Sequence, residues 1–178
     1  FASECFMPLS YGGGISTVDD AKKLFEIGVE KISIQSSAIN DLKIIEKISK
    51  IFGSQSIIFS IDIKKNWLGN YKLYSSSHRK KLKANWKKLI CDSISAGVGE
   101  ILLNSVDKDG TMSGMDYSLI SQASSLVSVP LIASGGVGKL GHIKSAINAG
   151  ASAVSVGSFF VFYGPHKAVL ISYPNPKE

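Results

Sequence analysis

The feature that most constrains this sequence is a regular alternation of short apolar, β-rich runs with amphipathic stretches of helical periodicity. Several helical stretches stop at a glycine, as helices commonly do, among them those before Gly28, Gly53 and Gly97. The alternation predicts strands over residues 6–11, 31–34, 56–61, 100–104, 130–133 and 153–156, and helices over residues 17–27, 41–52, 84–96, 117–126 and 140–149. Strands that alternate with helices form βαβ units and a parallel sheet.

Six strands with this spacing predict most of a (β/α)₈ barrel, the TIM-barrel fold. A complete barrel takes about 250 residues, whereas this chain has 178. We therefore expect one α/β domain over residues 1–178 that holds strands three to eight, with the first two βα units missing from the chain. Two open sheet edges would then remain, and this chain by itself is not expected to be an active enzyme.

The sequence repeats itself without a gap at an offset of 122 residues. At this offset Leu9–Ile15 (LSYGGGI) falls on Leu131–Val137 (LIASGGV), and Ser36 falls on Ser158. The offset is about half a barrel. A repeat of this kind predicts two similar sites related by a pseudo-twofold axis.

Each of the two glycine clusters directly follows a predicted strand, with Gly14 in the first and Gly136 in the second. Glycine lets backbone N–H groups approach an anion because no Cβ intervenes. Ser36 and Ser158, one strand further along, can add a hydroxyl or a helix N-terminus. Barrels bind phosphate at this mouth, so the repeat predicts a substrate with a phosphate at each end. A glycine cluster is also common in a plain tight turn.

Two aspartates are candidates for proton transfer. Asp62 ends the third predicted strand, and an acidic residue at such a strand tip is often catalytic in barrels. Its structural alternative is a helix cap or a salt bridge to Lys64 or Lys65. Asp109, in the run Asp107–Thr111, would supply a second carboxylate at the mouth. That run could also be a turn or, less well supported, a calcium loop.

The composition is that of an ordinary globular protein, with 44% apolar and 19% charged residues. No apolar run approaches the roughly 20 residues of a membrane helix, and residues 1–14 lack the pattern of a signal peptide. The net charge of +6 favours anionic partners, among them phosphorylated metabolites. Much of the excess lies in residues 79–88, which we interpret as a solvated surface or a basic active-site loop rather than a nucleic-acid-binding patch.

The cysteines and histidines give no sign of a metal centre. Cys5 and Cys91 have no CxxC or metal-type spacing and lie in apolar surroundings, so we expect two buried free thiols and a cytoplasmic protein. His78, His142 and His166 are scattered along the chain. We therefore expect neither a metal site nor another cofactor.

Seven motifs resemble the cyclase subunit (HisF family) of imidazole glycerol phosphate synthase, a (β/α)₈ barrel of the ribulose-phosphate-binding type. They are Gly12–Gly14, Lys31–Ile34, Phe52–Gln55, Ile61–Asp62, Gly99–Leu103, Ser105–Thr111 and Ile132–Gly136, and the similarity runs from Pro8 to about Phe162. The Asp-x-Asp-Gly-Thr run distinguishes this family from its sibling, the ribonucleotide isomerase of the same pathway.

The resemblance implies a cyclase/lyase that uses ammonia from a glutaminase (glutamine amidotransferase) partner. Its substrate would be the bis-phosphorylated phosphoribulosyl-formimino-carboxamide ribonucleotide, and its products imidazole glycerol phosphate and aminoimidazole carboxamide ribonucleotide. Asp62 would be one of two catalytic aspartates, the other lying on the missing first strand. The resemblance also implies phosphate contacts at Gly14, Gln35, Ser36, Gly136, Gly157 and Ser158, a mouth carboxylate at Asp109, and an ammonia entrance at Lys31 and Glu100.

The chain departs from the family pattern at four places: Gln35 and Ser36, the loop over residues 76–81, Asn104, and the tail over residues 159–174. The tail resembles that of a paralogous branch associated with surface-polysaccharide sugar amidation, in which the barrel would channel ammonia to another enzyme. A third alternative is a non-catalytic scaffold that docks a glutaminase. Neither a nucleic acid nor a membrane is an expected partner.

Overall fold

The computed structural model describes residues 7–164, 166 and 168–171 of the chain. Six parallel strands form a sheet in the order β1-β2-β3-β6-β7-β8, with the hairpin strands β4 and β5 added to β3. The parallel strands are β1 (Ser10–Gly12), β2 (Lys31–Ile34), β3 (Ile57–Lys65), β6 (Glu100–Ser105), β7 (Leu131–Ser134) and β8 (Ala153–Ser155). The predicted alternation of strands and helices in a parallel sheet is thus confirmed.

Helices follow the strands, as the βα pattern requires. They are α1 (Val18–Glu26), α2 (Ser36–Asn40), α3 (Lys43–Phe52), α4 (Trp86–Ser95), α5 (Tyr117–Ser124), α6 (Leu140–Asn148) and α7 (Ser158–Val161). A short 3₁₀ helix covers Ser54–Ser56, and a two-stranded hairpin joins β9 (Phe162–Tyr163) and β10 (Ala168–Val169). The sequence did not predict the short helices α2 and α7, and the start of the strand predicted over residues 6–11 lies outside the described residues.

Side-chain oxygens fix the starts of three helices. Thr17 accepts a hydrogen bond from the amide of Asp20 (3.1 Å), and the Asp20 carboxylate accepts one from the amide of Thr17 (2.9 Å), which completes a capping box at α1. Asn85 caps α4 and Asp116 caps α5 in the simpler way, through one side-chain oxygen. These local signals explain why the helix starts agree closely with the sequence prediction.

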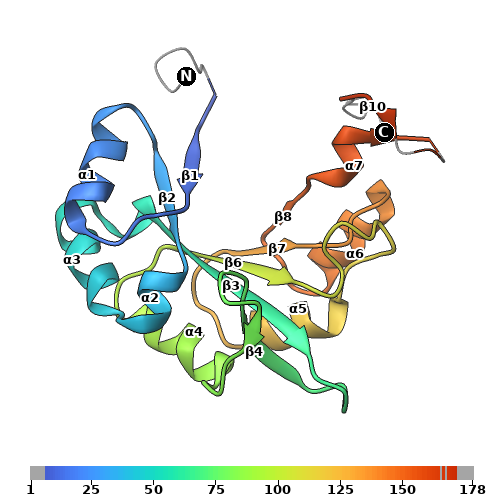
Figure 1. Cartoon of the computed structure of the whole chain (residues 1–178), viewed down its shortest axis with the longest axis horizontal. Helices are drawn as coiled ribbons and strands as arrows, with labels where there is room; N and C mark the ends of the chain where they lie inside the picture. Colours follow the sequence, from blue (N-terminus) through green and yellow to red (C-terminus); the bar gives the residue numbers. More distant parts are fainter. Residues whose placement is uncertain (1–6, 165, 167, 172–178) are drawn as a thin grey trace.

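The sheet curls, and its core lies on the face that the helices cover (Figure 1). Burial alternates along β2, β6 and β7, because their side chains toward the helices are buried while those on the other face are half-buried. Ile32, Ile61, Ile101 and Leu131 are each 0% exposed and pack with the apolar sides of the helices. Each such side chain stabilises the fold by about 1.5–3 kcal/mol. Within the described residues β1 and β8 pair on one side only, so the sheet is an open half-barrel.

One strand prediction needs correction, because β3 does not end at Asp62 but continues to Lys65. Its parallel pairing with β6 runs to Ile63, and its last four residues, from Asp62 to Lys65, also pair antiparallel with β4 (Tyr71–Ser75). The hairpin continues into β5 (Lys80–Lys81). Asp62 therefore lies where the sheet changes from parallel to antiparallel pairing. None of the helices in the described part of the chain is long and apolar enough to cross a membrane.

Candidate phosphate sites and carboxylate

The first glycine cluster forms the wall of a cavity of about 520 Å³. Gly12, at the end of β1, and the following Gly13 and Gly14 provide one side, and Gln35 and Ser36, directly after β2, provide the other. Ser36 is the first residue of α2. Two neighbouring strands thus contribute backbone and hydroxyl groups to the same space, as the sequence predicted for a phosphate site.

The second glycine cluster lines a cavity of about 80 Å³. Seven of its lining residues are the counterparts, at the 122-residue offset, of residues that line the first cavity: Ser134, Gly135, Gly136, Val137, Ser155, Gly157 and Ser158. The structure therefore places six of the predicted phosphate-contact residues in two equivalent hollows at the ends of strands half a barrel apart. The exposed Asp109 also lines the second hollow.

The two glycine loops need glycine for different reasons. Gly14 has φ +71° with nothing within 4 Å of where a Cβ would stand, so its backbone faces open space. Gly136 has φ +97°, and a Cβ there would stand 2.3 Å from the carbonyl oxygen of Gly114. The amide of Gly114 also donates to the carbonyl of Gly136 (2.8 Å). The missing side chain of Gly14 thus leaves space in the first hollow, whereas that of Gly136 lets its loop pack tightly against Gly114.

The Asp62 carboxylate is buried, with 6% of the residue exposed, and both of its oxygens accept hydrogen bonds. Asn104 donates its side-chain amide to Oδ1 (3.0 Å), and the Ser76 hydroxyl donates to Oδ2. No ion pair joins Asp62 to Lys64 or Lys65 in the described part of the chain, so neither of its structural alternatives applies. Asp62 lies on β3, one of the two strands between the hollows, but lines neither hollow.

Sequence reasoning missed both partners of Asp62. Asn104 is directly opposite Asp62 in the register of β3 and β6, which a correct strand alignment could have revealed. Ser76 follows β4, and only the hairpin brings it back to Asp62, so no local pattern marks it. The Oδ1 of Asn104 is buried and has no hydrogen-bond partner within the described residues. It lies 3.3 Å from where a Cβ on Gly135 would stand, beside the second hollow.

Lys31 and Glu100 form an ion pair at the starts of β2 and β6. These strands are not neighbours, because β3 lies between them, so the two side chains meet on the half-buried face of the sheet across β3. Their side chains are 35% and 18% exposed. The pair lies at the opposite ends of the strands from the two hollows, as predicted from the sequence.

A second network holds the β3–β4 hairpin against the start of α5. The carboxylate of Asp116 pairs with Lys65 (2.9 Å) and accepts hydrogen bonds from the Tyr71 hydroxyl (2.7 Å) and the amide of Leu119 (3.1 Å). Burial alone would raise the pKa of the Asp116 carboxyl, but these hydrogen bonds outweigh it and lower the pKa below its ordinary value. The network holds the turn end of the β3–β4 hairpin, where Lys65 pairs with Tyr71, against α5.

The lowered pKa of Asp116 gives a pH-dependent stability. The ionised carboxylate adds its full share to the free energy of unfolding when the pH is above the pKa of an Asp side chain in the unfolded chain, about 4. This share is lost as the pH falls through the lower pKa of Asp116 in the folded state. Asp116→Asn keeps the cap but loses the ion pair. We expect it to lower the free energy of unfolding by about 1 kcal/mol at neutral pH and to flatten the loss of stability in acid. Urea unfolding at several pH values measures both effects.

The matched control is Asp92→Asn, which removes an exposed partner of Lys88 on α4. Exposed pairs of this kind contribute about 0–1 kcal/mol, so this variant should behave almost like the wild type. If the two variants lost the same stability and kept the same acid dependence, the Asp116 network would have no special role.

The thiol prediction was half wrong. Cys91 is free, as expected, but it is exposed on α4, while the preceding Ile90 is fully buried. Successive helical residues point about 100° apart, so apolar neighbours in sequence did not imply burial. Cys5 lies outside the described residues. Among the described residues, no group of three or more His, Cys, Asp or Glu side chains could hold a metal ion.

A model of the family described as "Histidine biosynthesis protein" matches residues 1–166 of the chain. The chain is 45% identical over 178 residues to a Pseudomonas aeruginosa protein named "Putative imidazole glycerol phosphate synthase subunit hisF2", and the match covers 98% of the chain and 70% of the relative. It is 40% identical over 161 residues to the imidazole glycerol phosphate synthase subunit HisF of Dictyoglomus thermophilum, with coverage of 90% and 64%. The chain therefore belongs to the histidine biosynthesis protein family, with relatives that are named as HisF subunits.

Proposed function

We propose that this protein is an ammonia-dependent cyclase/lyase of histidine biosynthesis. Its substrate is the bis-phosphorylated phosphoribulosyl-formimino-carboxamide ribonucleotide, which it converts to imidazole glycerol phosphate and aminoimidazole carboxamide ribonucleotide. The observation that carries the proposal is the pair of equivalent hollows at the strand ends, built by the same seven positions of a repeated sequence. Two equivalent phosphate sites on one sheet suit a ligand with a phosphate at each end.

In this proposal the six parallel strands are strands three to eight of one barrel domain, and residues 1–178 form a single unit. Gly14, Gln35 and Ser36 bind one phosphate, while Gly136, Gly157 and Ser158 bind the other. Asp62, between them, transfers protons during ammonia addition and ring closure. Asp109 is the second carboxylate at the mouth, and the protein works in the cytoplasm as one subunit beside a glutaminase.

The experiment that tests the function is a product assay. The full-length protein is supplied with the bis-phosphorylated ribonucleotide and an ammonium salt, and both products are quantified by chromatography. We expect the two products in equal amounts, with no added metal or cofactor. Tight binding of the ribonucleotide without any product would contradict the cyclase proposal.

One observation favours the alternative of an ammonia-channelling subunit for sugar amidation. Both oxygens of Asp62 are engaged by Ser76 and Asn104, so the carboxylate is less free to exchange protons than a carboxylate with an open oxygen. In that alternative the product assay fails, while ammonia released from glutamine still reaches a sugar-amidating partner enzyme. A scaffold that only docks a glutaminase would show neither activity.

The Lys31–Glu100 pair is the proposed ammonia entrance at the bottom of the barrel. Buried ionic groups are costly unless they are paired, so a charged pair here can close the barrel and still admit a small polar molecule. An ordinary stabilising cluster is the structural alternative. Loss of an ammonia entrance would slow only the reaction driven by glutamine, whereas loss of a stabilising cluster would slow the reactions with glutamine and with ammonium salt alike.

We expect Lys31→Ala or Glu100→Ala to reduce the glutamine-driven reaction several-fold when the glutaminase is bound. The reaction fed with ammonium salt should change much less, because ammonia can also enter from the top of the barrel. Lys22→Ala, which removes an exposed pair with Glu26 on α1, is the matched control. Steady-state rates with each nitrogen source measure the difference. A loss by the same factor with both sources would assign the pair a purely structural role.

A further inference from the structure

A smaller cavity of about 190 Å³ lies beside the first glycine hollow. It shares Gln35, Ser36 and Asn40 with that hollow, so the two spaces adjoin. The remaining polar wall of the cavity comes from Ser75, at the end of β4, and from His78 and Lys80, in and after the turn between β4 and β5. This hairpin lies outside the repeated segments, and none of its residues lines the second hollow.

The side chain of His78 is held in one orientation by hydroxyl groups. Its Nδ1 lies 3.0 Å from the Oγ of Ser75 and 3.1 Å from the Oγ of Ser77. The Ser75 hydroxyl oxygen already accepts a hydrogen bond from the amide of His78 (3.3 Å), so its own proton can be donated to Nδ1. A neutral ring that accepts at Nδ1 carries its proton on Nε2.

When Nδ1 of His78 accepts from Ser75, its Nε2 group is a hydrogen-bond donor in the neutral and in the charged ring. Across the residues that the structure covers, it has no protein hydrogen-bond partner. Ser75 is only 8% exposed, so the group that sets the ring orientation is itself fixed by the fold. A donor prepared in this way on the wall of a cavity suits an acceptor on a ligand.

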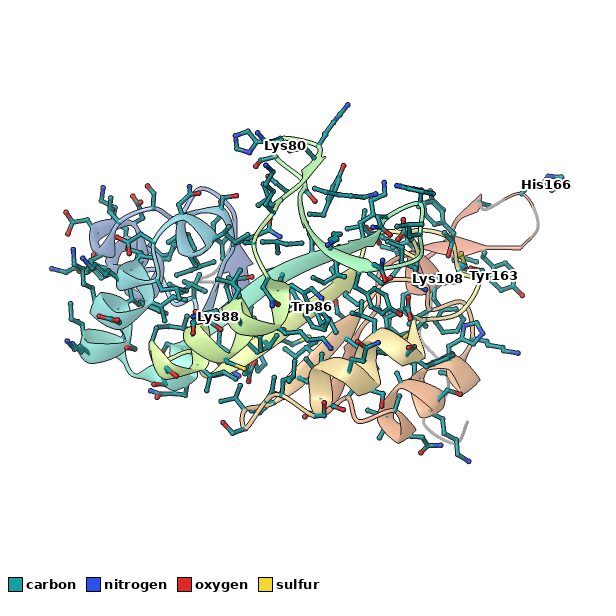
Figure 2. The ribbon with its side chains drawn as sticks, turned by 90° about the horizontal axis from the view of Figure 1, so that it is seen from below. Lys80, Trp86, Lys88, Lys108, Tyr163 and His166 are labelled. Atoms are coloured by element: carbon teal, nitrogen blue, oxygen red, sulfur yellow. The ribbon has the colours of Figure 1, made fainter. Side chains whose placement is uncertain are left out.

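Lys80 adds positive charge that no nearby acid neutralises. Residues 63–91 contain nine Lys and Arg and no Asp or Glu, while acidic residues outnumber basic ones in the rest of the chain. No ion pair involves Lys80 among the described residues. Figure 2 shows Lys80 on a hairpin that stands out from the rest of the molecule. The positive charge of the chain is thus concentrated on and just after the element that completes the cavity.

From these contacts we infer that the cavity is an anion-binding subsite, which takes a phosphate-like group next to the phosphate in the first glycine hollow. His78 donates from Nε2, Lys80 supplies the charge, and the shared Ser36 lies between the two positions. The inference rests on the proposed function, in which the first hollow holds a phosphate of the substrate. Within the described residues, the second hollow differs from the first, because its wall carries the carboxylate of Asp109 and neither a lysine nor a histidine.

Inorganic phosphate is the probe that tests the subsite. The 178-residue chain is titrated with phosphate at constant pH and ionic strength, and the imidazole signals of the histidines and the backbone amide signals are followed by NMR. We expect the His78 ring signal to shift to saturation. Lys80→Gln should weaken the phosphate affinity reported by His78 about 3- to 5-fold, the effect of one partly exposed charge.

Lys72→Gln is the matched control, because it removes the same charge from the same hairpin outside the cavity. It should leave the affinity reported by His78 unchanged. A His78 signal that does not move, or an equal effect of both lysine variants, would overturn the subsite. The amide of Gly14 reports the first hollow separately. If Gly14 shifts and His78 does not, the subsite fails and the proposed phosphate site stands; the reverse supports the subsite and counts against the proposed function.

Discussion

Replacing Asp62 by asparagine is expected to cut turnover of the full-length protein by about 100-fold or more, since that is the usual contribution of a positioned acid–base group. Asparagine has the same shape as aspartate and can still bond to Ser76 and Asn104, so the fold and the substrate affinity should stay near those of the wild type. The substitution removes the carboxylate that transfers protons but leaves a side chain of the same size in the same position. Steady-state kinetics with ammonium salt would show a fall in kcat with little change in KM.

Asp92→Asn provides the control for this experiment, because it makes the same chemical change on the outer surface of α4. Its kcat should equal that of the wild type. Thermal unfolding of both variants checks that the fold persists. Near-normal turnover of the Asp62 variant would remove this residue from the mechanism and leave its buried hydrogen bonds as a structural feature.

Gly14→Ala is expected to weaken binding of a bis-phosphate ligand by roughly 30-fold or more, because the added methyl group projects into the first hollow and displaces charge-assisted hydrogen bonds of about 1.5–3 kcal/mol each. Nothing in the protein lies within 4 Å of that methyl group, so the loss would come from the ligand and not from a clash inside the fold. Binding of a mono-phosphate that occupies only the second hollow should change little. Calorimetric titration with both ligands measures the two affinities.

Backbone strain is the main confounding effect, since Gly14 has φ +71°. An L-residue in that conformation costs about 1–2 kcal/mol. Gly69, at φ +78° and also without neighbours within 4 Å, lies in the turn between β3 and β4 away from both hollows. Gly69→Ala should therefore lose similar stability but keep its affinity. Equal loss of affinity in both variants would argue against a phosphate site at Gly14. Gly136 is less suitable, because its Cβ would collide with Gly114.

The sequence predicted the features that depend on local signals. The strand over Lys31–Ile34 was predicted at its observed bounds, since it lies between Gly28 and a polar stretch and alternates in burial. The glycine hollows were foreseen because each is formed by residues directly after two neighbouring strands, and strand order follows from the βα pattern. The 122-residue repeat then showed which residue of the second hollow corresponds to each residue of the first.

Features that depend on distant pairing could not be predicted in the same way. The contacts of Asp62 with Ser76 and Asn104 require the hairpin register and the alignment of β3 with β6, both of which are non-local. The Lys65–Asp116 ion pair joins residues 51 positions apart, and no periodicity connects them. The sequence also suggested Lys65 as a partner for Asp62, because it could not show that the strand continues and carries Lys65 to another carboxylate.

The unequal burial of the two sheet faces has a consequence for how such a protein can change over time. The side chains that hold the helices to the sheet, such as Ile61 and Leu103, are almost fully enclosed, so substitutions there are tolerated poorly. The opposite face carries Ser33 and Ser60, which are half-buried and lie outside the hydrophobic core. Substitutions at these two serines therefore cost less stability than substitutions in the core, so new substrate contacts can evolve there while the helices and the sheet stay packed as they are.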